Sequence, residues 1–218
     1  MMKISLLIAS IVLMNACSFQ APQNQWQHKS ASAFKSYKKN FLSNNDALAK
    51  SDLTRAIAHA KQSADFTQLA TIYLGVCSLN LANGVKDECR DYQEIADLVK
   101  SKELESYFKL ISDAIESEDI KHLPKEYQAF AQSLIKKDYT KANEDILNIQ
   151  KPSSAFVAAA LLKEHLETKT REYILDKASY NGYKKTVIFW LKEILKHTKD
   201  EEKIQKLQKK LFVLQGVE

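Results

Sequence analysis

Glycine and proline are scarce in this chain, whose 218 residues include only four glycines and three prolines. Loops that cradle phosphate groups need several glycines close together, so we find no nucleotide-binding fingerprint and no nucleophile elbow of the GxSxG type. No stretch of alternating β-branched residues is long enough to indicate a sheet, whereas apolar residues recur with the helical period. The composition therefore predicts an all-α fold.

A strong excess of charge of one sign is also missing. The net charge is +5 at neutral pH, which is too small for the basic surface of a nucleic-acid-binding protein, so we expect no nucleic-acid partner. The five histidines are scattered and form no HExxH motif, and the i,i+4 pair Glu193 and His197 is typical of a surface interaction. We therefore expect no catalytic residue, no metal ligand, no cofactor and no small-molecule substrate.

The sequence has one long apolar run, at its N-terminus. This run covers Ile4–Met14, follows the positive charge of Lys3 and stops shortly before Cys17. It is shorter than the roughly 20 residues that a permanent membrane-spanning helix needs. The segment resembles the signal peptide of bacterial lipoproteins, in which the cysteine is lipidated and becomes the first residue of the mature chain.

The match to the lipoprotein signal is imperfect at two positions. The family usually has leucine three positions before the cysteine and a small residue two before, where this chain has Met14 and Asn15, with Leu13 one step further out. The resemblance implies that residues 1–16 are removed and that Cys17 carries the lipid. An ordinary secretory signal or an uncleaved anchor is the alternative reading.

The residues after Cys17 predict a flexible spacer and the membrane in which the protein is anchored. Residues 17–30 are rich in Gln, Asn, Ser and Ala and predict a flexible tether, which leaves residues 31–218 as the folded domain. Ser18 follows the cysteine, whereas an aspartate there favours inner-membrane retention in enteric lipoproteins. The resemblance thus implies an anchor in the outer membrane, with the domain facing the periplasm.

Apolar stripes, caps and turn residues predict a succession of helices from Ala33 onward. Asn83-Gly84 and Asn181-Gly182 are typical of left-handed helix ends. The predicted helices start near residue 33 for the first and then cover approximately 46–60, 66–81, 87–99, 103–116, 125–136, 138–149, 155–167, 170–180, 183–197 and 201–214.

One turn between these helices resembles a known repeat. Residues 137–142, Lys-Asp-Tyr-Thr-Lys-Ala, are similar to the turn that opens the second helix of tetratricopeptide repeats (TPR). The resemblance covers hairpins at 66–99, 125–150 and 168–197, and it implies antiparallel helix pairs stacked as an α-solenoid. It is degenerate, because Phe130 replaces a small residue and the turns are about 54 and then 44 residues apart instead of 34. An irregular helical array is the alternative.

The two cysteines of the folded domain test this arrangement. Cys77 lies about six residues before the Asn83-Gly84 turn and Cys89 about five residues after it. In an antiparallel hairpin the two heights nearly coincide, so an oxidising compartment would allow a disulfide bond between them. Two buried, unpaired thiols that act as small apolar residues are the alternative.

Several aromatic residues surround the Asn181-Gly182 turn. Aromatic residues at helical spacing are usually core, but tyrosines next to a turn can face outward and anchor a partner. We therefore take Tyr173, Tyr180 and Tyr183 as candidate partner-binding residues.

These patterns together favour a non-enzymatic function. We expect a lipid-anchored protein of the cell envelope that binds an envelope protein or peptide in a concave groove of its helical domain. One alternative is an enzyme that acts on the cell wall, or the inhibitor of such an enzyme. The other is a surface-exposed lipoprotein that contacts a host or another cell.

Overall fold

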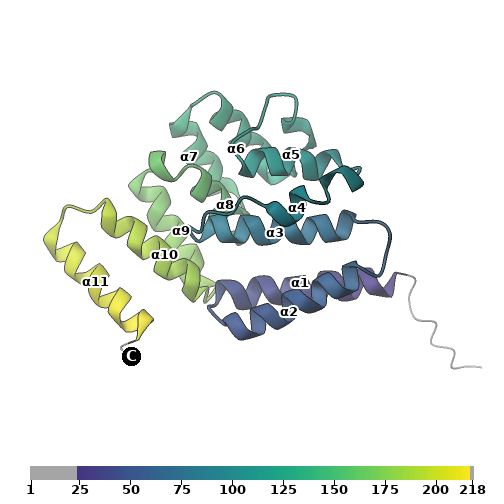
Figure 1. Cartoon of the computed structure of the whole chain (residues 1–218). Helices are drawn as coiled ribbons and strands as arrows, with labels where there is room; N and C mark the ends of the chain where they lie inside the picture. The colour runs from purple at the N-terminus through teal and green to yellow at the C-terminus, as the bar shows by residue number, and fades with distance from the viewer. Residues whose placement is uncertain (1–23, 217–218) are drawn as a thin grey trace, which may run out of the picture.

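The computed structural model describes residues 24–216, and every regular element in that range is a helix (Figure 1). This confirms the all-α prediction. The predicted signal peptide, 1–16, and the lipidation site, Cys17, lie outside the described residues. The helices are α1 (Gln25–Leu42), α2 (Asp46–Ala60), α3 (Thr67–Ala82), α4 (Arg90–Gln93), α5 (Lys102–Ile111), α6 (Lys125–Ile135), α7 (Tyr139–Asn148), α8 (Pro152–Leu161), α9 (Thr168–Tyr180), α10 (Lys184–Lys196) and α11 (Glu201–Gln215), with short 3₁₀ helices η2 (Ala96–Leu98), η3 (Ile120–His122) and η4 (Lys163–His165).

Consecutive helices pack against each other, among them α1 with α2, α6 with α7, α9 with α10, and α10 with α11. The residues that end helices behave as expected. Gly84 and Gly182 have φ values of +75° and +68°, the left-handed conformation in which glycine is favoured. Asp138 accepts a hydrogen bond from the backbone nitrogen of Lys141 and caps α7.

The helix predicted over 87–99 is the main error of the sequence analysis. The structure has only the four-residue α4 and the 3₁₀ helix η2 in this region. The left-handed φ of +54° at Cys89 keeps a helix from starting before Arg90, and α4 ends at Gln93, with Ile95 at a φ of −120° ahead of η2. The predicted helix over 155–167 is also interrupted, since α8 ends at Leu161 and η4 follows.

The first helix begins earlier than the sequence suggests. Residues 25–30, expected to belong to the tether, form the first turns of α1. Ser30 is fully buried, and its hydroxyl donates a hydrogen bond to the carbonyl oxygen of Ala56 at 2.9 Å. The N-terminal part of α1 is therefore packed against α2.

The largest apolar cluster lies in the second half of the chain. Trp190, Phe130 and Phe156 are its largest fully buried side chains, and they come from α10, α6 and α8. Ala82 of α3 belongs to the same cluster. Helix α8 is buried along most of its length, so it forms the centre around which the other helices pack.

Helix α10 returns to the first half of the chain, where Figure 1 shows its N-terminal end beside the α1–α2 pair. The hydroxyl of Thr186 donates a hydrogen bond to Oδ1 of Asn83 at 2.9 Å, across 103 residues of sequence. The Lys185 ammonium lies 2.5 Å from a carboxylate oxygen of Asp46. We call this contact of α10 with the Asn83-Gly84 turn and the first helix pair the closing seam.

Candidate functional site: a groove among five helices

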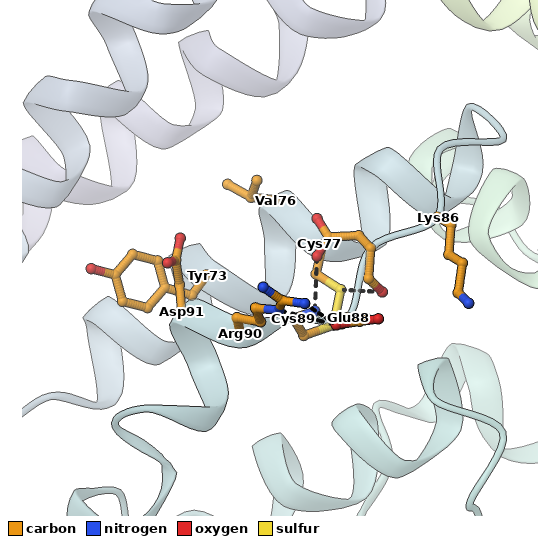
Figure 2. A pocket seen from close by; sticks show the side chains of 9 residues that line it. Tyr73, Val76, Cys77, Lys86, Glu88, Cys89, Arg90 and Asp91 are labelled. Atoms are coloured by element: carbon orange, nitrogen blue, oxygen red, sulfur yellow. Dashed lines mark hydrogen bonds and ion pairs between the residues drawn. A yellow bond between two sulfur atoms is a disulfide. The ribbon is translucent and has the colours of Figure 1, made fainter.

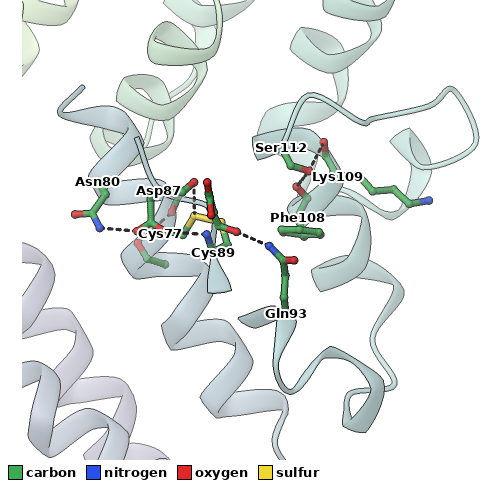
Figure 3. Close-up of a disulfide and its surroundings, with 11 residues drawn as sticks. Cys77, Asn80, Asp87, Cys89, Gln93, Phe108, Lys109 and Ser112 are labelled. Atoms are coloured by element: carbon green, nitrogen blue, oxygen red, sulfur yellow. Dashed lines mark hydrogen bonds between the residues drawn. A yellow bond between two sulfur atoms is a disulfide. The ribbon is translucent and has the colours of Figure 1, made fainter. Parts of the chain in front are cut away.

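Cys77 on α3 and Cys89, immediately before α4, form a disulfide bond (Figure 3). Their Cα atoms are 5.3 Å apart, inside the usual range for disulfides. The predicted pairing is confirmed, but Cys89 lies in the connection after α3 and not on a second long helix. Asp87 holds this connection, since its carboxylate accepts hydrogen bonds from the backbone nitrogen of Cys89 at 2.8 Å and from Nδ2 of Asn80 at 2.7 Å.

A hollow of about 360 Å³ lies beside the disulfide (Figure 2). Its exposed charges neutralise each other in part, because the Arg90 guanidinium lies 2.7 Å from a carboxylate oxygen of Glu88. The sulfurs of Cys77 and Cys89 and a carboxylate oxygen of Asp87 lie within 4.8 Å of one another, a spacing that would suit a metal ion. Metal ligation needs thiolates, whereas these sulfurs are bonded to each other, so the geometry favours a covalent link between α3 and the segment after it.

The three candidate partner-binding tyrosines have different environments. Tyr180 is 92% exposed. The Tyr173 hydroxyl donates a hydrogen bond to the carbonyl oxygen of Leu147 at 3.2 Å, and the Tyr183 ring packs edge-on against Phe156, 6.1 Å between centroids. Tyr173 and Tyr183 thus contribute to packing, and a partner-binding role for the three stays a prediction.

A more enclosed cavity of about 230 Å³ lies among α1, α3, α5, α6 and α8. We call it the inter-helix groove. Exposed Thr71 on α3 and Glu103 on α5 are part of its lining, so the groove opens at the surface. Its walls are mainly apolar and include Phe34, Leu74, Leu79, Leu104, Tyr107, Tyr127 and Val157.

Hydroxyl groups from four helices line one side of this groove. Ser78 on α3, Tyr107 on α5, Tyr127 on α6 and Ser154 on α8 carry these hydroxyls, and the rings of Tyr107 and Tyr127 lie 5.5 Å apart between centroids. Ser154 in turn donates to Oε1 of Glu126 at 3.3 Å. Burial raises the pKa of both tyrosines, so their hydroxyls stay protonated and can donate to a ligand.

The groove lining includes one basic and one acidic side chain, Lys38 and Glu103. Lys38 on α1 lines it, and this ammonium forms no salt bridge with any residue in the range 24–216. Burial lowers the pKa of Lys38, and the positive charges of Lys151 and Lys35 lower it further. A ligand that brings a negative charge or a hydrogen-bond acceptor would relieve this repulsion.

A single glycine brings two walls of the groove together. A Cβ atom at Gly75 would lie 2.3 Å from Cζ of Phe34, so only glycine lets the ring of α1 rest on the backbone of α3. Phe34 then faces the cavity as part of its apolar wall. The close approach of α1 and α3 at Gly75 is therefore part of the groove wall.

Glu126 lies beside the groove, where its carboxylate accepts a hydrogen bond from Ser154 of the lining. Burial alone would raise the pKa of Glu126, but hydrogen bonds from Lys151 and Ser154, together with the charge of Lys151, lower it overall. A general acid of a glycoside hydrolase needs a raised pKa. The lining of the groove offers hydrogen-bond donors, acceptors and apolar contacts.

The i,i+4 pair at the end of α10 is engaged within the protein. Glu193 is buried, and its carboxylate lies 2.6 Å from the Lys196 ammonium. A ring nitrogen of His197 lies 3.1 Å from the carbonyl oxygen of Glu193. These contacts satisfy both residues at the helix C-terminus.

Sequence reasoning missed the residues of the inter-helix groove. Tyr107 and Tyr127 occupy ordinary apolar positions of two helical stripes, and Lys38 is one of many lysines. These side chains come to line one groove only through the packing of five helices. Gly75 is the one signal that could have pointed here, because a glycine inside a helix usually marks a close approach.

Comparison with family models, curated proteins and solved structures finds no match to this chain. None of the helices between residues 24 and 216 combines the length and the apolar content that crossing a bilayer requires.

Proposed function

We propose that this protein is a non-enzymatic interaction scaffold of the cell envelope, anchored by a lipid on Cys17 and built from TPR-like helix pairs. The inter-helix groove carries the proposal, because it combines apolar walls, hydroxyl donors and a lysine without a counter-ion. Such a surface suits a segment of another protein that inserts an apolar side chain and presents an acceptor or acidic group nearby. The outer membrane, facing the periplasm, is the proposed location.

The helix pairs α6–α7 and α9–α10 support the TPR-like part of the proposal. Each is an antiparallel pair at one of the hairpins that resemble the repeat, and α8 packs between them, in contact with α6, α7 and α9. Stacked pairs of this kind create concave surfaces that bind extended peptides or helices.

The disulfide supports a location on the export side of the membrane. Disulfide bonds persist in oxidising compartments and are rare in the cytosol. The start of α1 at Gln25 adds a geometric consequence if Cys17 carries the lipid. Only residues 18–24 separate the two, and seven residues span at most about 25 Å. The helical domain would then be held close to the bilayer surface.

The anchor is tested by replacing its cysteine. We expect Cys17→Ser to abolish incorporation of labelled fatty acid and to move the protein from the membrane fraction to the soluble periplasmic fraction, because a single signal residue carries the lipid. Fractionation and lipid labelling of both forms measure this. A wild-type protein that is soluble in the cytosol, with residues 1–16 still attached, would refute the proposal.

The groove is tested with two threonines in matched positions. Thr71 lines the inter-helix groove, whereas Thr54 lies on α2, outside its lining, and both are exposed and donate to the carbonyl oxygen four residues earlier. Thr71→Arg places an unpaired charge against the bound segment. We expect it to reduce the amount of envelope protein that co-purifies from solubilised membranes by at least about tenfold.

Thr54→Arg adds the same charge elsewhere and should leave co-purification unchanged. Equal recovery with Thr71→Arg and wild type would rule out the groove as the binding site. If no envelope protein co-purifies reproducibly with the wild type, the scaffold function itself is wrong.

A further inference from the structure

A second groove lies at the C-terminal end of the molecule, between α11 and the α9–α10 pair. We call it the C-terminal groove. Its volume is about 690 Å³, which is within the range of ligand-binding clefts. Figure 1 shows α11 at the edge of the molecule, beside α10, so one side of this helix has no neighbour among the described residues.

The floor and one wall of the C-terminal groove are apolar. Leu191 of α10 is 2% exposed and lies at the bottom, with Leu175 of α9 and Val187 of α10 around it. Val213 of α11 forms part of the wall and is 70% exposed. An isolated protein leaves this apolar side chain in water, and a partner would bury it.

The rim of this groove carries mostly positive charge. Lys206, Lys209 and Lys210 line it from α11, and Asp176 of α9 is the acidic residue in the lining. Lys206 is paired with Glu202, whereas Lys209 and Lys210 form no salt bridge with any residue between 24 and 216. Two lysines without a salt bridge thus share the lining with one carboxylate, and this surplus of positive charge favours a negatively charged partner.

We propose that the C-terminal groove binds an amphipathic helix of a protein partner, with acidic residues beside its apolar stripe. Residues 206–214 of α11 extend over about 12 Å, or slightly more than two helical turns. A partner helix would therefore insert apolar side chains at positions i, i+4 and i+7. Its carboxylates would lie against the lysine rim. This proposal depends neither on the lipid anchor nor on the inter-helix groove.

The shape of the groove favours a helix over a lipid surface. The half-buried Leu175 and Val187 lie inside the groove, between α11 and the α9–α10 pair, where a flat bilayer surface cannot reach them. The neighbouring Phe212 is 63% exposed on the same helix but is not part of the groove lining. Membrane binding would use Phe212 at least as much as Val213, and this difference separates the two cases.

The experiment selects binders from a displayed library of helical peptides with fixed apolar residues at i, i+4 and i+7 and randomised flanks, using the purified domain. We expect the selected flanks to be enriched in aspartate and glutamate. For a selected peptide, Val213→Glu should weaken binding at least about tenfold, because it puts a carboxylate in the groove, while Phe212→Glu should change it less than about twofold. Circular dichroism of both variants checks that the helices are retained.

The proposal is overturned if the library yields no binders or if the selected flanks are neutral or basic. It is also overturned if Val213→Glu and Phe212→Glu weaken peptide binding equally. Binding to vesicles of anionic lipid that both variants reduce equally would assign α11 to the membrane. Concentration-dependent dimers of the wild type that Val213→Glu dissociates would assign the groove to a second copy of this chain.

Discussion

A protein in which serine replaces both Cys77 and Cys89 is expected to lose about 3 kcal/mol of free energy of unfolding. The disulfide joins residues 12 apart in sequence, and removing it returns loop-closure entropy to the unfolded chain. It also releases Cys89 from the link that helps to hold its left-handed backbone, so the segment between α3 and α5 should become more mobile.

Urea unfolding followed by circular dichroism measures this change. In a separate thermal scan, the melting temperature of the double variant should lie roughly 6–12 °C below that of the wild type for a domain of this size. The helix content should persist, because the largest apolar cluster does not include either cysteine. Wild type treated with a reductant should match the double variant.

Two observations would contradict the prediction. One is an equal stability of the oxidised wild type and the variant. The other is two reactive thiols in the mature wild type, denatured without reductant after isolation from an oxidising compartment. The second result would mean that Cys77 and Cys89 act as buried thiols.

Gly84→Ala is expected to destabilise the fold by about 2–4 kcal/mol. Part of the loss is the left-handed backbone, since Gly84 has a φ of +75°. The rest is steric, because a Cβ atom here would lie 2.2 Å from Cε2 of Phe189 on α10. The ring would have to shift away from the Asn83-Gly84 turn, and the closing seam would loosen.

Gly182→Ala is the matched control for this substitution. Gly182 has a similar φ of +68°, but a Cβ atom there would meet nothing within 4 Å. We therefore expect a loss of only about 1 kcal/mol, from the backbone alone. Chemical unfolding of the two variants side by side separates the two contributions. Equal losses would show that the contact between Gly84 and Phe189 contributes nothing to stability.

Local chemistry explains which parts of the fold could be predicted. Asp138 at the start of α7 and Gly182 at the end of α9 act through contacts within a few residues, so they are readable in the sequence. The helix predicted over 87–99 starts too early, because the apolar pattern continues through Cys89, while the backbone there is held by the disulfide and by Asp87. That conflict is decided by tertiary contacts.

The inter-helix groove was unpredictable for a related reason. Tyr107 and Tyr127 are 20 residues apart and meet with ring centroids 5.5 Å from each other. Their positions follow from the packing of α5 and α6 against α3 and α8, and no local pattern specifies that packing. The C-terminal groove could not be predicted either, because it depends on how α11 packs against α9 and α10. Only its lysines can be read directly from the sequence.

The closing seam restricts where helix pairs can be added to this fold or removed from it. A linear stack of repeats can gain or lose a unit at many places, because each unit contacts only its neighbours. Here an additional helix pair between α3 and α10 would separate Thr186 from Asn83 and Phe189 from Gly84. Duplications within that stretch should be selected against, and new segments are tolerated best beyond α11 or ahead of α1.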